Sequence, residues 1–465
     1  MTTHTLIQFF YLGSAILFIL SLRGLRGAES ARRGLFYAEL GMLLAIIGTL
    51  LKQEIISYEW ILVGLIVGTA IGTPMGLWIP MTKMPERIAL SHAFGGLAVT
   101  LVGVSEYYLF KHHGASWNVL KMTATGAEVL LGAITFTGSL MAFGKLQGIL
   151  PGRPTTYPMQ NVSNVLMLVA AVGIAIYMVF EPGAEAFFYI MAAAGALLGI
   201  LLVMPIGGAD MPVVICLLNS YAGLAASATG FAIDNNALII CGALDGGSGF
   251  ILALMMSKAM NRSFGNVIFG AFGTVQEGPA GTTATGPAPN TGSVDDAVEI
   301  LRVARSVIVI PGYGMAVSQA QHAVRDLSNA LKANGAEVRY AIHPVAGRMP
   351  GHMNVLLAEA NVAYEDLYDL DDINGDFSAT DVALVVGAND VVNPAARTNK
   401  ASPIYGMPVF NTEEARSVIV LKRTLNPGFA GIENELFIKT NTMLVLGDAK
   451  RTIQSFASGL KESSH

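Results

Sequence analysis

Nine long apolar runs in the first 270 residues constrain the fold of this chain more than any other feature. A bilayer core of roughly 30 Å is crossed by a helix of about 20 apolar residues. The runs are Leu6–Leu22, Gly34–Leu51, Trp60–Ile79, Ile88–Leu109, Ala127–Phe143, Val165–Phe180, Phe187–Met204, Pro212–Phe231 and Leu238–Met256. We therefore predict a multi-span α-helical membrane domain of about nine helices.

Charged residues divide the chain into two physically different parts. Residues 1–270 contain 25 of the Asp, Glu, Lys and Arg residues and residues 271–465 contain 36. The second part therefore has about twice the charge density of the first, and a soluble domain carries roughly 25% charged residues. We predict a membrane domain over 1–270, a flexible linker over 271–292, which is rich in Gly, Pro and Thr, and a water-soluble domain over 293–465.

Positive residues in the short loops predict the orientation of the spans. With the N-terminus outside, the inner loops hold ten Lys and Arg residues and the outer loops hold three. The inner residues are Arg23, Arg26, Arg32, Arg33, Lys83, Arg87, Lys145, Arg153, Lys258 and Arg262, and the outer ones are Lys52, Lys111 and Lys121. An odd number of spans then places the C-terminal domain in the cytoplasm. No Lys or Arg precedes Arg23, so the first run is expected to be a retained span rather than a cleaved signal peptide.

Polar residues inside the apolar runs are candidates for function. An ionisable side chain in hydrocarbon is costly and usually faces a bundle interior or a wet cavity. His92 is the leading candidate, as a proton relay, because imidazole titrates near neutral pH. The plain alternative is a neutral histidine bonded to a neighbouring helix. Asn219 is either a partner of His92 or a bond between helices, and Glu128 and Asp245 are further candidates.

After residue 292, apolar runs rich in β-branched residues alternate with helical patterns. Strands are predicted at Ser306–Ile310, Val338–Ile342, Val382–Val386, Val418–Leu421 and Met443–Leu446, with a sixth near Asp366–Leu370. Helices are predicted at Ala316–Ala333 and Asp448–Leu460. This order indicates an α/β domain with a doubly wound (Rossmann-like) parallel sheet, in which ligands bind at the carboxyl ends of the strands.

The first predicted strand runs into a glycine-rich turn and then a helix. The turn contains Gly312 and Gly314, with Val317 where the dinucleotide fingerprint usually has its third glycine. Glycines allow a tight turn and close backbone approach, and the helix N-terminus favours an anion such as a pyrophosphate. The context favours nucleotide binding; a tight turn without a ligand is the alternative.

Two further strand ends suggest which nucleotide binds. The second strand ends at Ile342 and is followed by His343-Pro344, with no acidic residue to hold a ribose 2′-hydroxyl. The later strand ends in Lys422-Arg423-Thr424, two cations and a hydroxyl suited to a 2′-phosphate, although such cations also form solvated rims. This combination favours NADP over NAD. Asn389 and Asp390 also follow a strand; they belong to the ligand edge or to an ordinary polar turn.

These segments together resemble the β subunits of proton-translocating NAD(P) transhydrogenases. The resemblance covers nearly the whole chain. The matching segments are Pro311–Val317, His343–Ala360, Gly387–Ala396, Lys422-Arg423 with Gly428–Gly431, and, in the membrane part, Ser91–Gly96 with Asn219.

The resemblance implies a role for each matching position. The C-terminal domain would bind NADP(H) in a reversed orientation. Residues Gly312, Tyr313, Gly314, Met315, Ala316 and Val317 would contact the nucleotide, as would Asn389, Gly428 and Gly431. Arg348 would lie near the phosphates, Lys422, Arg423 and Thr424 near the 2′-phosphate, and Asp390 near the nicotinamide, where it takes part in coupling. His92 and Asn219 would lie on the proton path, whereas Asp245 has no place in the family's pattern.

The function that the resemblance implies is a membrane subunit of a proton-pumping enzyme. A hydride would pass from NADH, bound by a separate alpha subunit, to NADP⁺ bound here, and inward proton flow would favour NADPH formation. The resemblance further implies a bacterial inner membrane, surrounding lipid and a dimer of the whole complex. We find no second glycine fingerprint, so NAD(H) needs a partner. The net charge of −5 and the lack of a basic stripe argue against nucleic acid.

Two other kinds of protein would share some of these features. A transporter or channel gated by a nucleotide-sensing domain would need no hydride partner. A membrane dehydrogenase that passes electrons to quinone would need a flavin or metal relay. The histidines and the two cysteines show no metal-ligand spacing, so no metal site is predicted and the dehydrogenase ranks last.

Overall fold

The computed structural model describes residues 3–462, apart from 26, 53–57, 114–117, 153, 208–209, 261–263, 266–288, 401, 403 and 429. Most of the predicted linker, residues 271–288, lies outside the described residues, as do Arg26, Arg153 and Arg262. Contacts divide the chain into two compact units. One holds most of residues 1–253, and the other holds the residues from 254 onward with the short segments 81–85 and 207–213.

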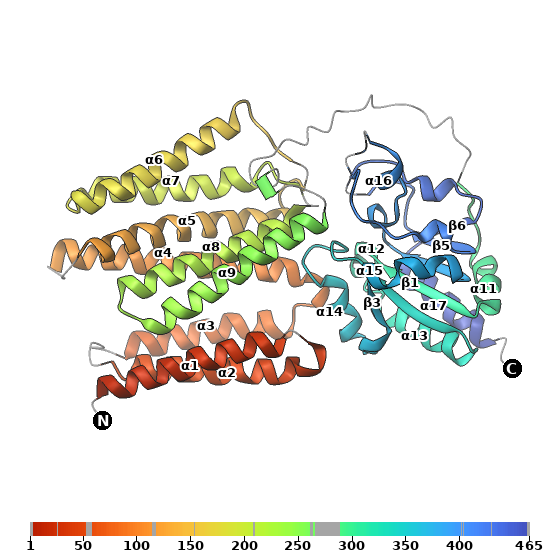
Figure 1. The fold of residues 1–465 in the computed structure, drawn as a ribbon, viewed down its shortest axis with the longest axis horizontal. Coiled ribbons are helices and arrows are strands. Elements are labelled where there is room, and N and C mark those ends of the chain that lie inside the picture. Colours follow the sequence, from red (N-terminus) through yellow and green to blue (C-terminus); the bar gives the residue numbers. More distant parts are fainter. Residues whose placement is uncertain are drawn as a thin grey trace. The chain divides into compact units, whose positions relative to one another are not determined.

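Nine helices in the described part of the first 260 residues are long and apolar enough to cross a membrane (Figure 1). They are α1 Thr3–Leu25, α2 Ala28–Leu50, α3 Glu59–Leu77, α4 Met84–His113, α5 Val119–Leu146, α6 Gln160–Phe180, α7 Glu185–Val203, α8 Met211–Ala232 and α9 Asn236–Ala259. Six of them contain their whole predicted apolar run, and α2, α3 and α7 end one or two residues before their run does. This part of the fold prediction is therefore confirmed. Most extend past their run, since a helix continues into the polar interface after its apolar residues end.

Glycines bring several of these helices into backbone contact. A Cβ atom on Gly96 of α4 would lie 2.7 Å from the backbone nitrogen of Phe136 on α5. A Cβ on Gly199 of α7 would lie 2.8 Å from the nitrogen of Gly138 on α5. Only small residues permit such close helix contacts, which supply much of the packing energy between membrane helices. By contrast, α3 has no buried side chain.

Lys145, predicted as one of the inner-loop charges, is instead a buried residue near the end of α5. Its Nζ atom donates hydrogen bonds to the carbonyl oxygens of Val203, Met204 and Ile206. These carbonyls lie at and just beyond the C-terminus of α7, where a positive charge is favoured by the helix dipole. Lys145 therefore caps α7 and fixes it against α5.

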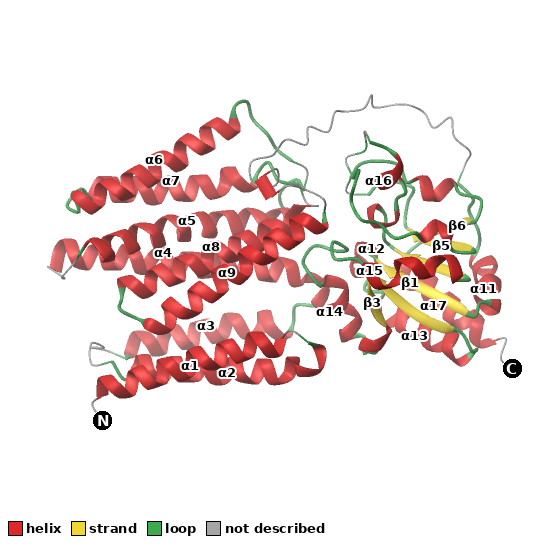
Figure 2. Ribbon diagram, viewed as in Figure 1, coloured by secondary structure: helices red, strands yellow, loops and turns green. Residues whose placement is uncertain are grey.

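The second unit is built on a β-sheet, drawn in yellow in Figure 2. The sheet has six strands in the order β3-β2-β1-β4-β5-β6. All neighbouring strands are parallel. The strands are β1 Ser306–Pro311, β2 Glu337–Ile342, β3 Leu367–Asp369, β4 Val382–Val386, β5 Ser417–Lys422 and β6 Thr442–Leu446. Each predicted strand is present within one residue at either end, and the predicted doubly wound sheet is confirmed. The strand order reverses between β1 and β4, where ligands bind in such sheets.

Alternate residues of the strands pack into two separate cores. Val307 and Val309 of β1 face a core shared with the helices α11 Val294–Val303, α13 Gln321–Ala333 and α17 Ala449–Glu462. Ile308 and Ile310 face the other core, which is closed mainly by short turns of helix. The remaining helices are short: α12 Tyr313–Val317, α14 His352–Glu359, α15 Leu370–Ile373 and α16 Ala395–Thr398.

The predicted helix over Ala316–Ala333 is wrong, because the structure divides it into α12 and α13. The helix is interrupted between Val317 and Gln321, where Gln319 has a left-handed backbone conformation with φ of 50°. The hydroxyl of Ser318 donates to the carbonyl oxygen of Gly314, which ends α12 locally. The helix that follows the glycine turn is therefore only five residues long.

Candidate functional site

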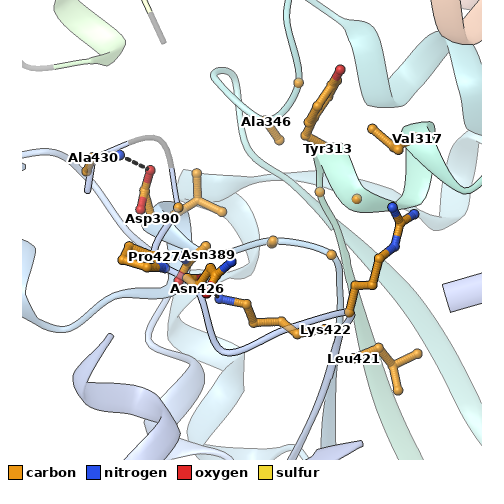
Figure 3. Close-up of a pocket in the computed structure, with 18 of the residues that line it drawn as sticks. Tyr313, Val317, Ala346, Asn389, Asp390, Leu421, Lys422, Asn426, Pro427 and Ala430 are labelled. Carbon is orange, nitrogen blue, oxygen red and sulfur yellow. Dashed lines mark hydrogen bonds between the residues drawn. The ribbon is translucent and has the colours of Figure 1, made fainter. Parts of the chain in front are cut away.

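A pocket of about 570 Å³ opens at the carboxyl ends of β1, β4 and β5 (Figure 3). This volume falls within the range of roughly 300–1,000 Å³ that is usual for small-molecule and cofactor sites. Ten predicted site residues line it: Gly312, Tyr313, Gly314, Val317, Asn389, Asp390, Lys422, Arg423, Thr424 and Gly428. The fold thus brings together, at the point where the strand order reverses, residues that are far apart in the sequence.

Four other predicted nucleotide contacts do not line this pocket. The side chains of Met315 and Ala316 are buried in the core beneath the sheet edge, so only their backbone is available to a ligand. Gly431 is exposed and takes a left-handed backbone with φ of 69°. Arg348 lies outside the lining but stacks on a residue inside it: its guanidinium carbon is 4.3 Å from the centre of the Tyr313 ring. This distance is typical of a cation–π contact.

The glycines of the first turn interlock with the turn that follows β4. The backbone nitrogens of Gly312 and Gly314 donate to the carbonyl oxygens of Val386 and Gly387, each at 2.9 Å. A Cβ on Gly314 would lie 2.7 Å from the Cα of Gly387. The close approach that requires glycine here is therefore between two turns of the protein. Because α12 is so short, its dipole adds little to anion binding.

The turn after β4 is tied to the segment that follows β5. The carboxylate of Asp390 accepts a hydrogen bond from the backbone nitrogen of Ala430 at 3.0 Å, drawn in Figure 3. Asn434 donates through Nδ2 to the backbone and side-chain oxygens of Asn389, at 3.0 and 2.9 Å. A Cβ on Gly428 would collide with both Asn389 and Asp390. Gly428 and Ala430, in the segment that follows β5, thus lie against the β4 turn.

Lys422, Arg423 and Thr424 lie together on one rim of the pocket. The ammonium group of Lys422 donates to the carbonyl oxygen of Asn426 at 2.7 Å and lies 4.7 Å from the centre of the Phe437 ring. Burial lowers the pKa of Lys422, and the charge of Asp390 acts in the opposite direction. Arg423 is 63% exposed, 3.8 Å from Asp448, and Thr424 is exposed. Both side chains are open to the solvent at the pocket mouth.

Sequence reasoning missed part of the pocket lining. Gly447 directly follows the predicted last strand, so its place at a strand end was a usable signal. Val345 and Ala346 follow the second strand in the same way. Ile404 and Met407 come from a long connection between β4 and β5, and nothing in their local sequence marks them as pocket residues.

In the membrane unit, His92 of α4, Asn219 of α8 and Asp245 of α9 lie together. The Nδ2 atom of Asn219 donates to Oδ1 of Asp245 at 3.1 Å. The His92 ring lies beside the Asn219 side chain and within range of the Asp245 charge. The structure thus places Asp245, whose role the sequence left open, beside the two predicted proton-path residues. Glu128, the remaining candidate, is fully buried on α5.

These features define a class: a multi-pass membrane protein that carries a doubly wound α/β domain with a pocket at its switch point. The family model described as NAD(P) transhydrogenase beta subunit matches residues 7–458. Two relatives named NAD(P) transhydrogenase subunit beta, both from Rhodospirillum rubrum, are 47% identical to it over 464 residues, which is 98% of this chain and 100% of each relative. The chain therefore belongs to the NAD(P) transhydrogenase beta subunit family, and it is an enzyme subunit.

Proposed function

We propose that the C-terminal domain binds NADP(H) and exchanges a hydride with NAD(H) held by the alpha subunit, coupled to proton movement through the membrane domain. Membership of a transhydrogenase beta family supports an alpha-subunit partner and the use of nicotinamide nucleotides. The assignment of NADP(H) to this chain rests on its own pocket.

The observation that carries the proposal is the charge at two strand ends. Lys422 is the last residue of β5, and Arg423 follows it. Both residues line the pocket, as does Thr424 next to them. A guanidinium and an ammonium group hold a phosphate as a fork and a point charge. At the end of β2, where an NAD site places an acid for the 2′-hydroxyl, the chain has His343, which is buried and pairs with the carbonyl oxygen of Pro408.

Other pocket residues fit a dinucleotide. Among the described residues, the Nδ2 atom of Asn389 is buried without a hydrogen-bond partner, and Asn389 lines the pocket. It is a donor available to an oxygen atom of a ligand. Tyr313 supplies an aromatic face at the mouth, with Arg348 stacked on it. The predicted contacts therefore surround one space of suitable size.

The nicotinamide rings supply the hydride chemistry, so the protein needs no side-chain acid or base at the reacting carbon. The chain's residues hold and orient the nucleotide. The bond from Ala430 to Asp390 ties the loop that follows β5 to the β4 turn at this point. We propose that this loop is the element through which protonation of His92 alters NADP(H) affinity, since coupling needs one two-state element that both sites bias.

The wider setting follows from the same proposal. The complex would lie in a bacterial inner membrane, with the N-terminus of this chain outside and the C-terminal domain in the cytoplasm. The ten inner positive residues against three outer ones support that orientation. Two copies of the whole complex would form a dimer.

The direct test is nucleotide affinity of the purified full chain in detergent, measured for NADPH and NADH by titration. In the Lys422→Ala/Arg423→Ala variant we expect NADPH affinity to fall by about a hundredfold or more, since each of the two charge-assisted bonds is worth roughly 1.5–3 kcal/mol. NADH affinity should change little, because NADH has no 2′-phosphate.

The matched control is Arg416→Ala/Lys439→Ala, which removes the same two charges from residues that do not line the pocket. It should leave both affinities unchanged. The NADP(H) assignment is wrong if the wild-type chain binds NADH more tightly than NADPH. It is also wrong if the Lys422→Ala/Arg423→Ala variant binds NADPH as tightly as the wild type does.

A further inference from the structure

The two helices α8 and α9 are locked together at the level of Asn219. Gly223 of α8 sits so close to Gly246 of α9 that a Cβ would overlap its backbone nitrogen. The hydroxyl of Ser220 donates to the carbonyl oxygen of Gly246 at 2.7 Å. A Cβ on Gly249 would lie 2.8 Å from the Asn219 amide nitrogen. Asn219 therefore has a fixed position against α9. Only small residues at these contact points allow the two helices to approach so closely.

Asp245 is the single acidic residue of α9, a helix with mean hydropathy 1.9. It lies nine residues into a helix of 24, well away from both ends, and its side chain is exposed. A carboxylate at this depth is costly in hydrocarbon and is kept where it pairs with another group or faces water. Its partner is the Asn219 amide, which uses an N–H to reach it.

This bond determines what Asn219 offers to His92. Because the amide nitrogen is directed to Asp245, the amide oxygen is left to accept a hydrogen bond from the imidazole that lies beside it. The Nδ1 atom of His92 is buried and, among the described residues, has no hydrogen-bond partner. A protonated imidazole here therefore depends on nearby negative charge, and Asp245 is the charge within range.

We propose that Asp245 is the counter-charge of protonated His92 and that it positions Asn219 between them. The inference rests on the proposed proton-coupled function. During a cycle the proton enters and leaves on His92, and Asn219 carries no extra proton. Asp245 is then a positioning residue with an electrostatic task that a neutral hydrogen-bond acceptor cannot perform.

The test uses the complete enzyme with its alpha subunit in sealed proteoliposomes, with hydride transfer and proton uptake measured together. Asp245→Asn keeps an oxygen that can accept the Asn219 N–H but removes the charge. We expect its proton uptake to fall by about tenfold or more, the order of effect of removing an opposite charge within about 6 Å. Asp245→Glu, which keeps the charge, should restore most of the uptake.

The matched control is Asp234→Asn, the same chemical change in the loop between α8 and α9, where Asp234 pairs with Lys121. It should leave proton uptake unchanged. NADPH affinity should also stay at the wild-type value in Asp234→Asn. If Asp245→Asn fails to assemble, the double variant His92→Asn/Asp245→Asn is examined, and a counter-charge role predicts that it assembles because neither charge is left.

Several outcomes would overturn the proposal. If Asp245→Asn pumps protons at the wild-type rate, the bond between Asn219 and Asp245 is only a packing contact. The same conclusion follows if Asp245→Glu does not restore proton uptake, or if the double variant still fails to assemble. These results leave the proposed function standing. A wild-type enzyme that transfers hydride without moving protons would overturn the proposed function itself, and the counter-charge with it.

Discussion

His343 shows how one buried residue shapes the edge of the pocket. Its Nδ1 atom accepts a hydrogen bond from the backbone nitrogen of Val345, and its Nε2 atom donates to the carbonyl oxygen of Pro408 at 2.8 Å. Both ring nitrogens are therefore used by the neutral form. The side chain is 2% exposed and fixes the chain after β2 against the segment before Phe410.

This arrangement predicts a pH-dependent stability. Burial lowers the pKa of His343 to about 4, whereas in the unfolded chain a histidine titrates near 6.5. The unfolded state therefore binds the proton first. The contribution of neutral His343 to the free energy of unfolding is therefore complete above about pH 6.5. It is lost as the pH falls toward about 4, and the loss reaches up to about 3 kcal/mol.

The measurement is denaturant unfolding of the C-terminal domain within the full chain, between pH 7.5 and 4.5. The decline in the free energy of unfolding should be shallower in His343→Asn than in the wild type. The exposed residue His322 gives the control, and His322→Asn should keep the wild-type slope. Equal slopes for wild type and His343→Asn would contradict the assignment.

At the scale of elements, the glycine turn after β1 and the turn after β4 act as one unit. Gly387 has φ of 65°, and a Cβ on it would lie 2.5 Å from the Cα of Gly314. Gly387→Ala therefore combines a left-handed backbone with overpacking against a backbone that cannot yield. We expect a loss of roughly 2–4 kcal/mol in the free energy of unfolding.

Thermal unfolding of the full chain provides the measurement. The control is Gly375→Ala, because a Cβ there meets no atom within 4 Å and its φ is not left-handed. It should unfold within a degree or two of the wild type. A Gly387→Ala variant as stable as Gly375→Ala would show that the two turns can separate without cost.

The elements that could be predicted well from the sequence are those in which a run of apolar residues is also buried in the fold. β4 is buried at every residue and reads as a continuous run of Val, Ala and Leu. The break after α12 could not be predicted, because Ser318, Gln319 and Ala320 include neither Pro nor Gly. It depends on a side-chain bond to Gly314 and on packing of the short helix against the sheet.

The same distinction applies to the site. Residues at strand ends were predictable, because parallel strands deliver their carboxyl ends to one edge. The contacts of Asn389 and Asp390 were not predictable, because Gly428, Ala430 and Asn434 reach these two residues from a loop with no periodic pattern.

For the whole molecule, the arrangement of the membrane helices depends on contacts far apart in sequence. His92, Asn219 and Asp245 come from the fourth, eighth and ninth spans, and backbone contacts between glycines hold α8 to α9. Each residue could be chosen from the sequence as a costly polar group. Their grouping required the packing, and Asp245 has a partner only because α8 and α9 approach so closely.

The orientation of the chain is the remaining prediction at this scale. Lys and Arg favour the cytoplasmic side of the short loops, and ten against three places the N-terminus outside. The structure modifies the count without reversing it: Lys145 is a buried helix cap, and the other positive residues still favour the same side. The loop between α6 and α7 should then face outward and α17 should face the cytoplasm.

Single cysteines at exposed positions test this orientation. Glu181, after α6, and Ser455, on α17, are both exposed. In intact spheroplasts a membrane-impermeant maleimide should label Glu181→Cys at once and Ser455→Cys only after permeabilisation. The wild-type chain is the background control, since Cys216 is buried and Cys241 partly so. The reverse labelling order would show that the chain has the opposite orientation in the membrane. Protons that drive NADPH formation would then have to enter from the side on which the nucleotide-binding domain lies.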